Sequence, residues 1–225
     1  ENGLSATLNS YGGIAVGIGG FSGELELKFP STISANTTSY VRIDFDTDFL
    51  NALLGGSLGD LLADVLGTVI FGNHYFNIEA RNGNTTVLSK SSIIPPQDNR
   101  FRIVQDKNGD FFIAITPSQE YDRIYIEDNT DALLLGIFNS MEVYNAFYFT
   151  DNQCNIDPLY TDYDGNGITL DIINIGGAGV TDPQNVIDED ENTKSEISLG
   201  IIGVLASMEQ NVYFPSPYTP TEEFS

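Results

Sequence analysis

The chain has little of what metal sites, disulfides and nucleic-acid interfaces are built from. Its 225 residues include one cysteine, one histidine, no tryptophan and only nine Lys and Arg residues against 32 Asp and Glu, giving a formal charge of −23. One Cys and one His cannot supply the usual zinc ligands, and a disulfide within the chain is impossible. A polyanion without a basic face is not expected to bind nucleic acid, and anionic membrane surfaces repel it.

The sequence also lacks a pattern for membrane insertion or export. The Leu-rich stretch 49–71 contains Asp60, Asp64 and several glycines, which argues against a membrane-spanning helix. The first residues have neither a basic segment nor an uninterrupted apolar one, so no signal peptide is predicted here. We expect the chain to be part of a longer protein whose targeting signals lie elsewhere.

Short runs of alternating apolar and polar residues recur along the chain, bounded by Gly, Pro, Asn and Asp. In Glu24–Phe29 the apolar side chains share one face and the charged side chains the other. This period of two predicts antiparallel strands that pack one face on a common core, and hence an all-β sandwich. The predicted strands are 24–29, 40–45, 75–81, 101–105, 111–116, 123–127 and 142–149, with an Asn-Gly hairpin turn at 105–110.

One segment has a helical pattern instead. Ser57–Asp60 resembles a capping box, apolar residues follow at helical spacing as far as Leu66, and Gly67 is a natural stop. The sequence therefore predicts one short helix near 57–66, closing an end of the sandwich.

Two segments of the chain resemble each other at a constant offset. Residues 10–31 and 195–216 both end in Phe-Pro-Ser, and Glu24 matches Glu209. This similarity predicts a tandem repeat of about 185 residues. We divide the chain into 1–149, the later part of one module; 150–160, a linker that contains Cys154; and 161–225, the opening part of the next module. The two similar strands are expected at equivalent positions, with Leu27 and Val212 on the same relative face.

The acidic residues are concentrated in one part of the chain. Residues 124–193 contain 14 Asp and Glu residues and no Lys or Arg. Two interpretations stay open: a solvated acidic surface, or divalent cations that supply the missing charge. The strongest candidate is a Ca²⁺ site at the turn 188–193, where Asp188, Asp190 and Thr193 are the predicted ligands. The segment 162–167 begins like an EF-hand loop but lacks the acid at the twelfth position, so we predict a turn first and a metal site second.

Catalysis is the less favoured interpretation of this sequence. Paired carboxylates could make a glycosidase, but among 32 acidic residues many pairs are close by chance. Acidic surroundings raise the pKa of a thiol, which argues against Cys154 as a nucleophile, and the hypothesis for Cys154 is a partner outside this sequence. His74 is predicted to end a strand or lie in a turn. Several tyrosines lie near the module junction, namely Tyr160, Tyr163, Tyr213 and Tyr218. Two interpretations of them stay open: stacking on sugars or on a neighbouring module, and ordinary core packing.

The segments 176–193 and 10–30, together with the later Val-Tyr-Phe-Pro-Ser-Pro, resemble repeated modules of very large surface proteins of Bacteroidetes. This resemblance implies export by the type 9 secretion system, a location at the bacterial cell surface and a role in gliding or surface attachment. The segment 176–193 and Tyr121–Ile126 are also similar to discoidin-like, galactose-binding-type β-sandwiches, which implies a jelly-roll fold. The absence of Trp and the scarcity of cations depart from the lectin pattern.

Together, these observations predict a non-enzymatic module of a long, secreted cell-surface adhesin. Neighbouring modules of the same chain are its expected partners, and surface glycans or polysaccharides are further candidates. The alternative interpretation is a carbohydrate-binding module of a secreted polysaccharide-acting protein, and a hydrolase fragment is the third.

Overall fold

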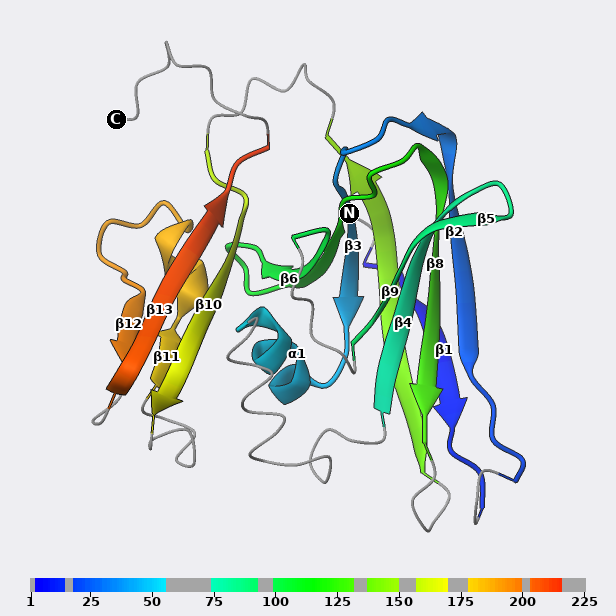
Figure 1. Ribbon diagram of the computed structural model, residues 1–225, viewed down its shortest axis with the longest axis horizontal. Helices are drawn as coiled ribbons and strands as arrows, with labels where there is room; N and C mark the ends of the chain where they lie inside the picture. The colour runs from blue at the N-terminus through cyan, green and yellow to red at the C-terminus, as the bar shows by residue number, and fades with distance from the viewer. Residues whose placement is uncertain are drawn as a thin grey trace.

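The computed structural model describes residues 3–14, 18–55, 74–92, 99–131, 137–149, 157–169, 178–199 and 203–215. Within them the fold is the predicted all-β antiparallel sandwich (Figure 1). The larger sheet consists, in spatial order, of β1 (Ala6–Tyr11), β9 (Phe138–Tyr148), β3 (Ser39–Asp44), β7 (Phe111–Ile115), β6 (Phe101–Gln105), β10 (Tyr160–Thr169) and β13 (Gly203–Tyr213). The smaller sheet consists of β2 (Gly23–Ile33), β8 (Tyr121–Thr130), β4 (His74–Asn82) and β5 (Thr85–Ser91).

The chain crosses back and forth between the two sheets. Strands β1, β3, β7 and β9 lie in the larger sheet, and β2, β4, β5 and β8 lie opposite them in the smaller one. This is the double Greek-key path of a jelly roll, so the predicted jelly-roll fold is confirmed. Strand β6 is an addition, paired with β7 through a hairpin.

The period-two pattern explains how each strand contributes to the core. In β3, Val41 and Ile43 face the smaller sheet, while Tyr40 and Arg42 point to the outer side. Every predicted strand falls on an observed one, with small differences at the ends. The largest fully buried side chains come from both sheets and include Phe76, Phe101, Tyr121, Ile124 and Ile126.

The hairpin turn between β6 and β7 is present where it was predicted, but it is longer than a two-residue Asn-Gly turn. Asp106 Oδ1 accepts hydrogen bonds from the backbone N–H groups of Asn108 and Asp110, each at 2.9 Å. Only Gly109, with φ of 82°, has a positive φ angle in this turn. The Asp106 side chain therefore organises the turn, and Gly109 makes the reversal possible.

One short helix, α1 (Thr47–Leu54), packs against the sheet beside β6 and β10. It buries Leu50, Leu53 and Leu54, and the Tyr163 hydroxyl of β10 donates to the Asn51 carbonyl at 3.2 Å. The helix predicted near 57–66 lies outside the described residues. Among the helices that are described, none has the length and apolarity needed to cross a membrane.

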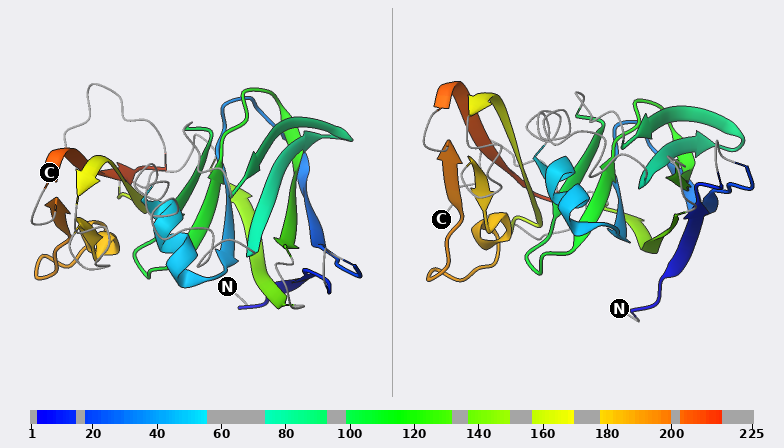
Figure 2. Two further views of the ribbon diagram at one scale, coloured as in Figure 1. Left: turned by 60° about the horizontal axis from the view of Figure 1, so that its bottom comes forward. Right: turned by 90° about the horizontal axis from the view of Figure 1, so that it is seen from below.

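Strands β10 and β13 continue the larger sheet beyond the sandwich. Thr161 of β10 pairs with Gln105 of β6, and β10 pairs along its length with β13. The short strands β11 (Ala178–Thr181) and β12 (Glu196–Leu199) and the 3₁₀ turn η2 (Pro183–Val186) form a second layer against this pair (Figure 2). We call residues 157–169, 178–199 and 203–215 the lobe.

The two segments of the predicted repeat are both strands, β2 and β13. They lie in different sheets, and Leu27 and Val212 are both half-buried. Tyr160, the last residue of the predicted linker, begins β10. The repeat and the division into 1–149, 150–160 and 161–225 stay predictions.

Candidate functional site

The turn between η2 and β12 brings together the three residues predicted to bind calcium. Buried Ile187 anchors the turn, and Glu189 has a left-handed backbone with φ of 65°. Asp188 Oδ2 accepts a hydrogen bond from Thr193 Oγ1 at 2.7 Å, and Asp188 Oδ1 accepts one from the Asp190 backbone N–H at 2.9 Å. Thr193 Oγ1 also donates to the Asp190 carbonyl at 2.8 Å, so the Asp188 side chain, the Asp190 main chain and the Thr193 hydroxyl share one hydrogen-bonded turn. Calcium binding by these residues stays a prediction.

Both aspartates of this turn accept hydrogen bonds from N–H or O–H donors of the turn itself. Asp190 Oδ1 accepts from the Asn192 backbone N–H at 2.9 Å, and this bond holds the pKa of Asp190 below its usual range. The acidic sequence predicts a cation at this turn. The hydrogen-bond donors of the turn itself supply part of the positive potential expected from that cation. Among the described residues, no three Asp, Glu, His or Cys side chains gather closely enough to hold a metal ion by themselves. Any cation here would need water and main-chain oxygens as well.

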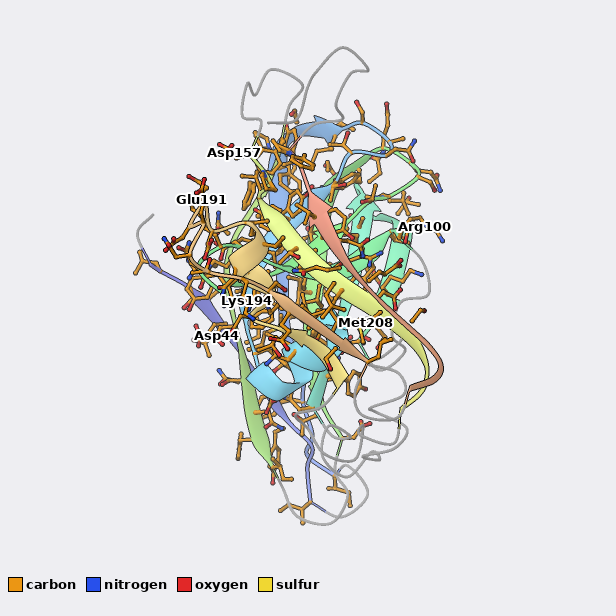
Figure 3. The ribbon with its side chains drawn as sticks, turned by 90° about the vertical axis from the view of Figure 1, so that its left-hand side faces the viewer. Asp44, Arg100, Asp157, Glu191, Lys194 and Met208 are labelled. Carbon is orange, nitrogen blue, oxygen red and sulfur yellow. The ribbon has the colours of Figure 1, made fainter. Side chains whose placement is uncertain are left out.

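Cations from elsewhere in the chain reach the acidic stretch. Glu189 accepts a hydrogen bond from Lys107 Nζ at 2.8 Å, which ties the acidic turn to the β6–β7 hairpin. Figure 3 looks onto the lobe and labels Asp157, Glu191 and Lys194. This tertiary contact gives Glu189 a cation that the charge count along the sequence did not reveal.

The second predicted loop is a strand. Residues 162–167 lie inside β10 and pair with β13, so the prediction of a turn is wrong. Gly165 is needed because a Cβ atom there would lie 3.0 Å from both Met208 Sδ and the Ser207 carbonyl oxygen. An EF-hand wraps a loop around its ion, whereas this segment is extended along a neighbouring strand.

Asp162, from that segment, is the centre of a buried polar network. Its side chain is 2% exposed and accepts hydrogen bonds from Arg102 Nε, from Asn211 Nδ2 at 2.9 Å and from the Tyr213 hydroxyl at 2.9 Å. Burial raises the pKa of Asp162, and the Arg102 guanidinium opposes that rise. The network joins β6, β10 and β13, so it attaches the lobe to the sandwich.

Aromatic rings surround this network on the outer face of the larger sheet. Tyr40 stacks on Tyr160 with ring centroids 4.6 Å apart and on Phe147 at 5.8 Å. Phe112 meets Tyr160 edge-on at 5.1 Å, and Tyr213 packs against the same cluster. Tyr160 and Tyr213 thus serve packing between the lobe and the sandwich, while Tyr163 faces the opposite side and Tyr218 lies outside the described residues.

A second buried carboxylate lies at the far end of the sandwich. Asp128 is fully buried, and it accepts a hydrogen bond from Ser10 Oγ at 2.8 Å and contacts His74 Nε2 at 2.6 Å. His74 stacks on Phe45 with ring centroids 4.1 Å apart. Ser10 bonds to the carboxylate and not to the imidazole, so the trio lacks the nucleophile–base contact of a serine hydrolase. Cys154, the other weighed nucleophile, lies outside the described residues.

The sequence did not reveal either buried network. Ser10, His74 and Asp128 are far apart along the chain, as are Arg102 and Asp162. The only local signal was the polar residue at an inward-facing position of β8, where the alternation places Ile124, Ile126 and Asp128 on one face.

Comparison with protein-family models, curated proteins and solved structures finds no match for this chain.

Proposed function

We propose that this chain is a non-enzymatic module of a long, secreted bacterial cell-surface adhesin that acts in attachment or gliding. The observation that supports this most is the pairing of β6 with β10, because it makes the segment assigned to the next module an extension of the same sheet. A shared sheet, with the Asp162 network and the Tyr40 ring cluster across it, forms a stiff junction. Stiff junctions suit a module that spaces a binding tip away from the cell.

Calcium at Asp188, Asp190 and Thr193 is part of this proposal. These residues lie in one exposed turn of the lobe, and the ion pair between Lys107 and this turn is made by the neighbouring Glu189. Calcium takes six to eight oxygen ligands, so water and a carboxylate from a neighbouring module would complete the shell.

Surface display of the chain on a non-adherent bacterium tests the adhesin proposal. We expect displayed chain to increase attachment to solid surfaces, while the purified chain releases no sugar from polysaccharides. Selective binding of the purified chain on a glycan array would favour the alternative, a carbohydrate-binding module. Release of reducing sugar by the purified chain would contradict the non-enzymatic assignment.

A further inference from the structure

The lobe meets the sandwich along a short seam, which we define as the contacts of the lobe with β3, β6, β7 and α1. Within the described residues, β10 pairs with β6 at one position, Thr161 with Gln105. By contrast, β10 pairs with β13, and β6 with β7, along the length of the strands (Figure 1). The strand pairing that holds each part together is therefore far more extensive than the pairing that joins the two parts.

The paired position of the seam carries a buried polar atom without a hydrogen bond. Gln105 is 8% exposed, and its Nε2 donates to the Gly109 carbonyl at 3.0 Å. Its Oε1 is buried and has no hydrogen-bond partner among the described residues. Such an acceptor raises the free energy of the closed seam, because it has lost water without gaining a donor. Separation of β10 from β6 returns water to this oxygen.

The ion pairs of the seam add little net attraction. The Arg102–Asp162 pair takes both groups largely out of water, so desolvation offsets much of the attraction between them. The side chains of Lys107 and Glu189 are 52% and 62% exposed, and an ion pair between exposed groups contributes little. The ring cluster around Tyr40 therefore supplies most of the attraction that keeps the seam closed.

The lobe has a polar network of its own that keeps its elements together. Gln210 Nε2 donates to the Thr161 hydroxyl at 3.0 Å and to the Pro183 carbonyl at 2.8 Å, and Gln210 Oε1 accepts from the Ser195 hydroxyl at 2.8 Å. These bonds link β10, β13, η2 and the residue before β12, all of them within the lobe. The lobe can therefore leave the sandwich as one body.

We infer that the seam is a joint that opens in the native protein, with the lobe separating as a unit while the strand pairing within each part stays intact. A joint that is stiff when closed can still be the first part of a molecule to open. The open state exposes the edge of β6 and the rings of Tyr40 and Phe112, so it presents an edge strand and an apolar surface that the closed state hides. The inference does not depend on the adhesin proposal.

Thiol labelling of two buried cysteine probes in the full chain, each in a Cys154→Ser background, tests the inference. Val104 lies in the ring cluster of the seam and Val143 lies between the two sheets, at 1% and 0% exposure. We expect Val104→Cys to react at least a hundredfold faster than Val143→Cys. Its rate should also depend far less on urea, because opening the seam exposes little surface.

Circular dichroism checks that both probe variants are folded. Equal labelling rates with equal urea dependence would overturn the inference, because the chain would then open only by unfolding as a whole.

Two carboxylate variants separate the seam from the rest of the molecule. Asp162→Asn weakens the ion pair across the seam, so it is expected to speed the labelling of Val104→Cys at least tenfold and to leave Val143→Cys unchanged. Asp128→Asn is the matched control, because it makes the same change at a buried carboxylate at the far end of the sandwich. It should leave the labelling of Val104→Cys unchanged. An equal effect of the two variants on Val104→Cys would contradict the inference.

Discussion

At the scale of single residues, two carboxylates, Asp162 and Asp128, are buried in this acidic chain, each with its own hydrogen-bonding partners. Asp162 accepts hydrogen bonds from the Arg102 guanidinium and from two neutral donors. Asp128 accepts a hydrogen bond from a serine hydroxyl and contacts the His74 imidazole. A buried carboxylate without such partners would be costly, because burial disfavours its charged form. Both clusters therefore matter for stability, and each has a partner whose removal can be tested.

Arg102→Ala is expected to destabilise the protein by about 3–5 kcal/mol at pH 7, since it leaves Asp162 as a buried charge without its cation. The cost should shrink as the pH falls. Burial already raises the pKa of Asp162, and the loss of Arg102 raises it further. A carboxyl group whose pKa is higher in the folded than in the unfolded protein stabilises the folded state fully at pH values below the unfolded-state pKa. This stabilisation is lost as the pH rises through the folded-state pKa. Urea unfolding of both proteins at pH 7 and pH 5 measures the effect.

Arg102→Ala combined with Asp162→Asn is the control for that measurement. The double variant should lose most of the pH dependence, because the titratable group that remains in the network is Tyr213, and burial raises the pKa of its phenol, so that it stays protonated at pH 5 and pH 7. A cost for Arg102→Ala that is the same at both pH values would show that Asp162 is not the responsible group.

His74→Ala is expected to cost about 1–3 kcal/mol, because Asp128 then loses a partner in a site that water does not reach. Loss of the stacking on Phe45 adds to this cost. Lys194→Ala, at an exposed position with only a weak contact to Glu196 at 3.4 Å, is the control and should change stability by less than about 0.5 kcal/mol. Similar unfolding midpoints for the two variants would contradict the role assigned to His74.

At the scale of elements, the sequence predicts a strand well where one face of that strand is exposed to solvent and the other is buried. It predicts β10 wrongly, because Asp-Tyr-Asp-Gly-Asn-Gly has turn-forming residues while pairing with β13 and the distant Arg102 decide its structure. The helix α1 is only eight residues long, too short for a clear helical pattern. The Asp188–Thr193 turn was predictable because its hydrogen bonds are local.

The close approach of β1 and β2 depends on Gly23. A Cβ atom at this position would lie 2.7 Å from the Asn9 nitrogen and 2.8 Å from its carbonyl oxygen, and backbone atoms cannot move aside as a side-chain end can. We expect Gly23→Ala to cost about 1–3 kcal/mol by overpacking. Thermal unfolding against Ser31→Ala, an exposed substitution in the same strand, measures this. Equal midpoints for the two variants would show that β1 and β2 can separate without cost.

The Asp188–Thr193 turn is expected to bind Ca²⁺, and a ligand that binds only the folded state raises the unfolding midpoint. We expect Ca²⁺ to raise the midpoint more than NaCl of equal ionic strength, and excess chelator to reverse the rise. Asp188→Asn should abolish the difference. Glu191→Gln removes the same charge outside the predicted ligand set and should keep it. An equal response of both variants would assign the effect to general screening.

At the scale of the whole molecule, the jelly roll and the lobe share one sheet, but the jelly roll has a closed core of its own. Strands β1 to β9 all lie within residues 1–149, and their core is closed by two sheets. The lobe contributes the outer cover of β3 and β7, where Tyr160 lies against Tyr40 and Phe112. The sandwich should therefore be able to fold without the lobe, at a lower stability.

Truncation to residues 1–149 tests this and the predicted module division together. We expect a cooperative urea transition at a lower midpoint, because Tyr40 and Phe112 become exposed and β6 becomes an unprotected edge strand. The slope of the transition should fall in proportion to the smaller surface that unfolding exposes. A fragment that shows no cooperative transition would mean that the lobe belongs to the same folding unit as the sandwich. The boundary between modules would then lie beyond the lobe, and both β10 and β13 would belong to the first module.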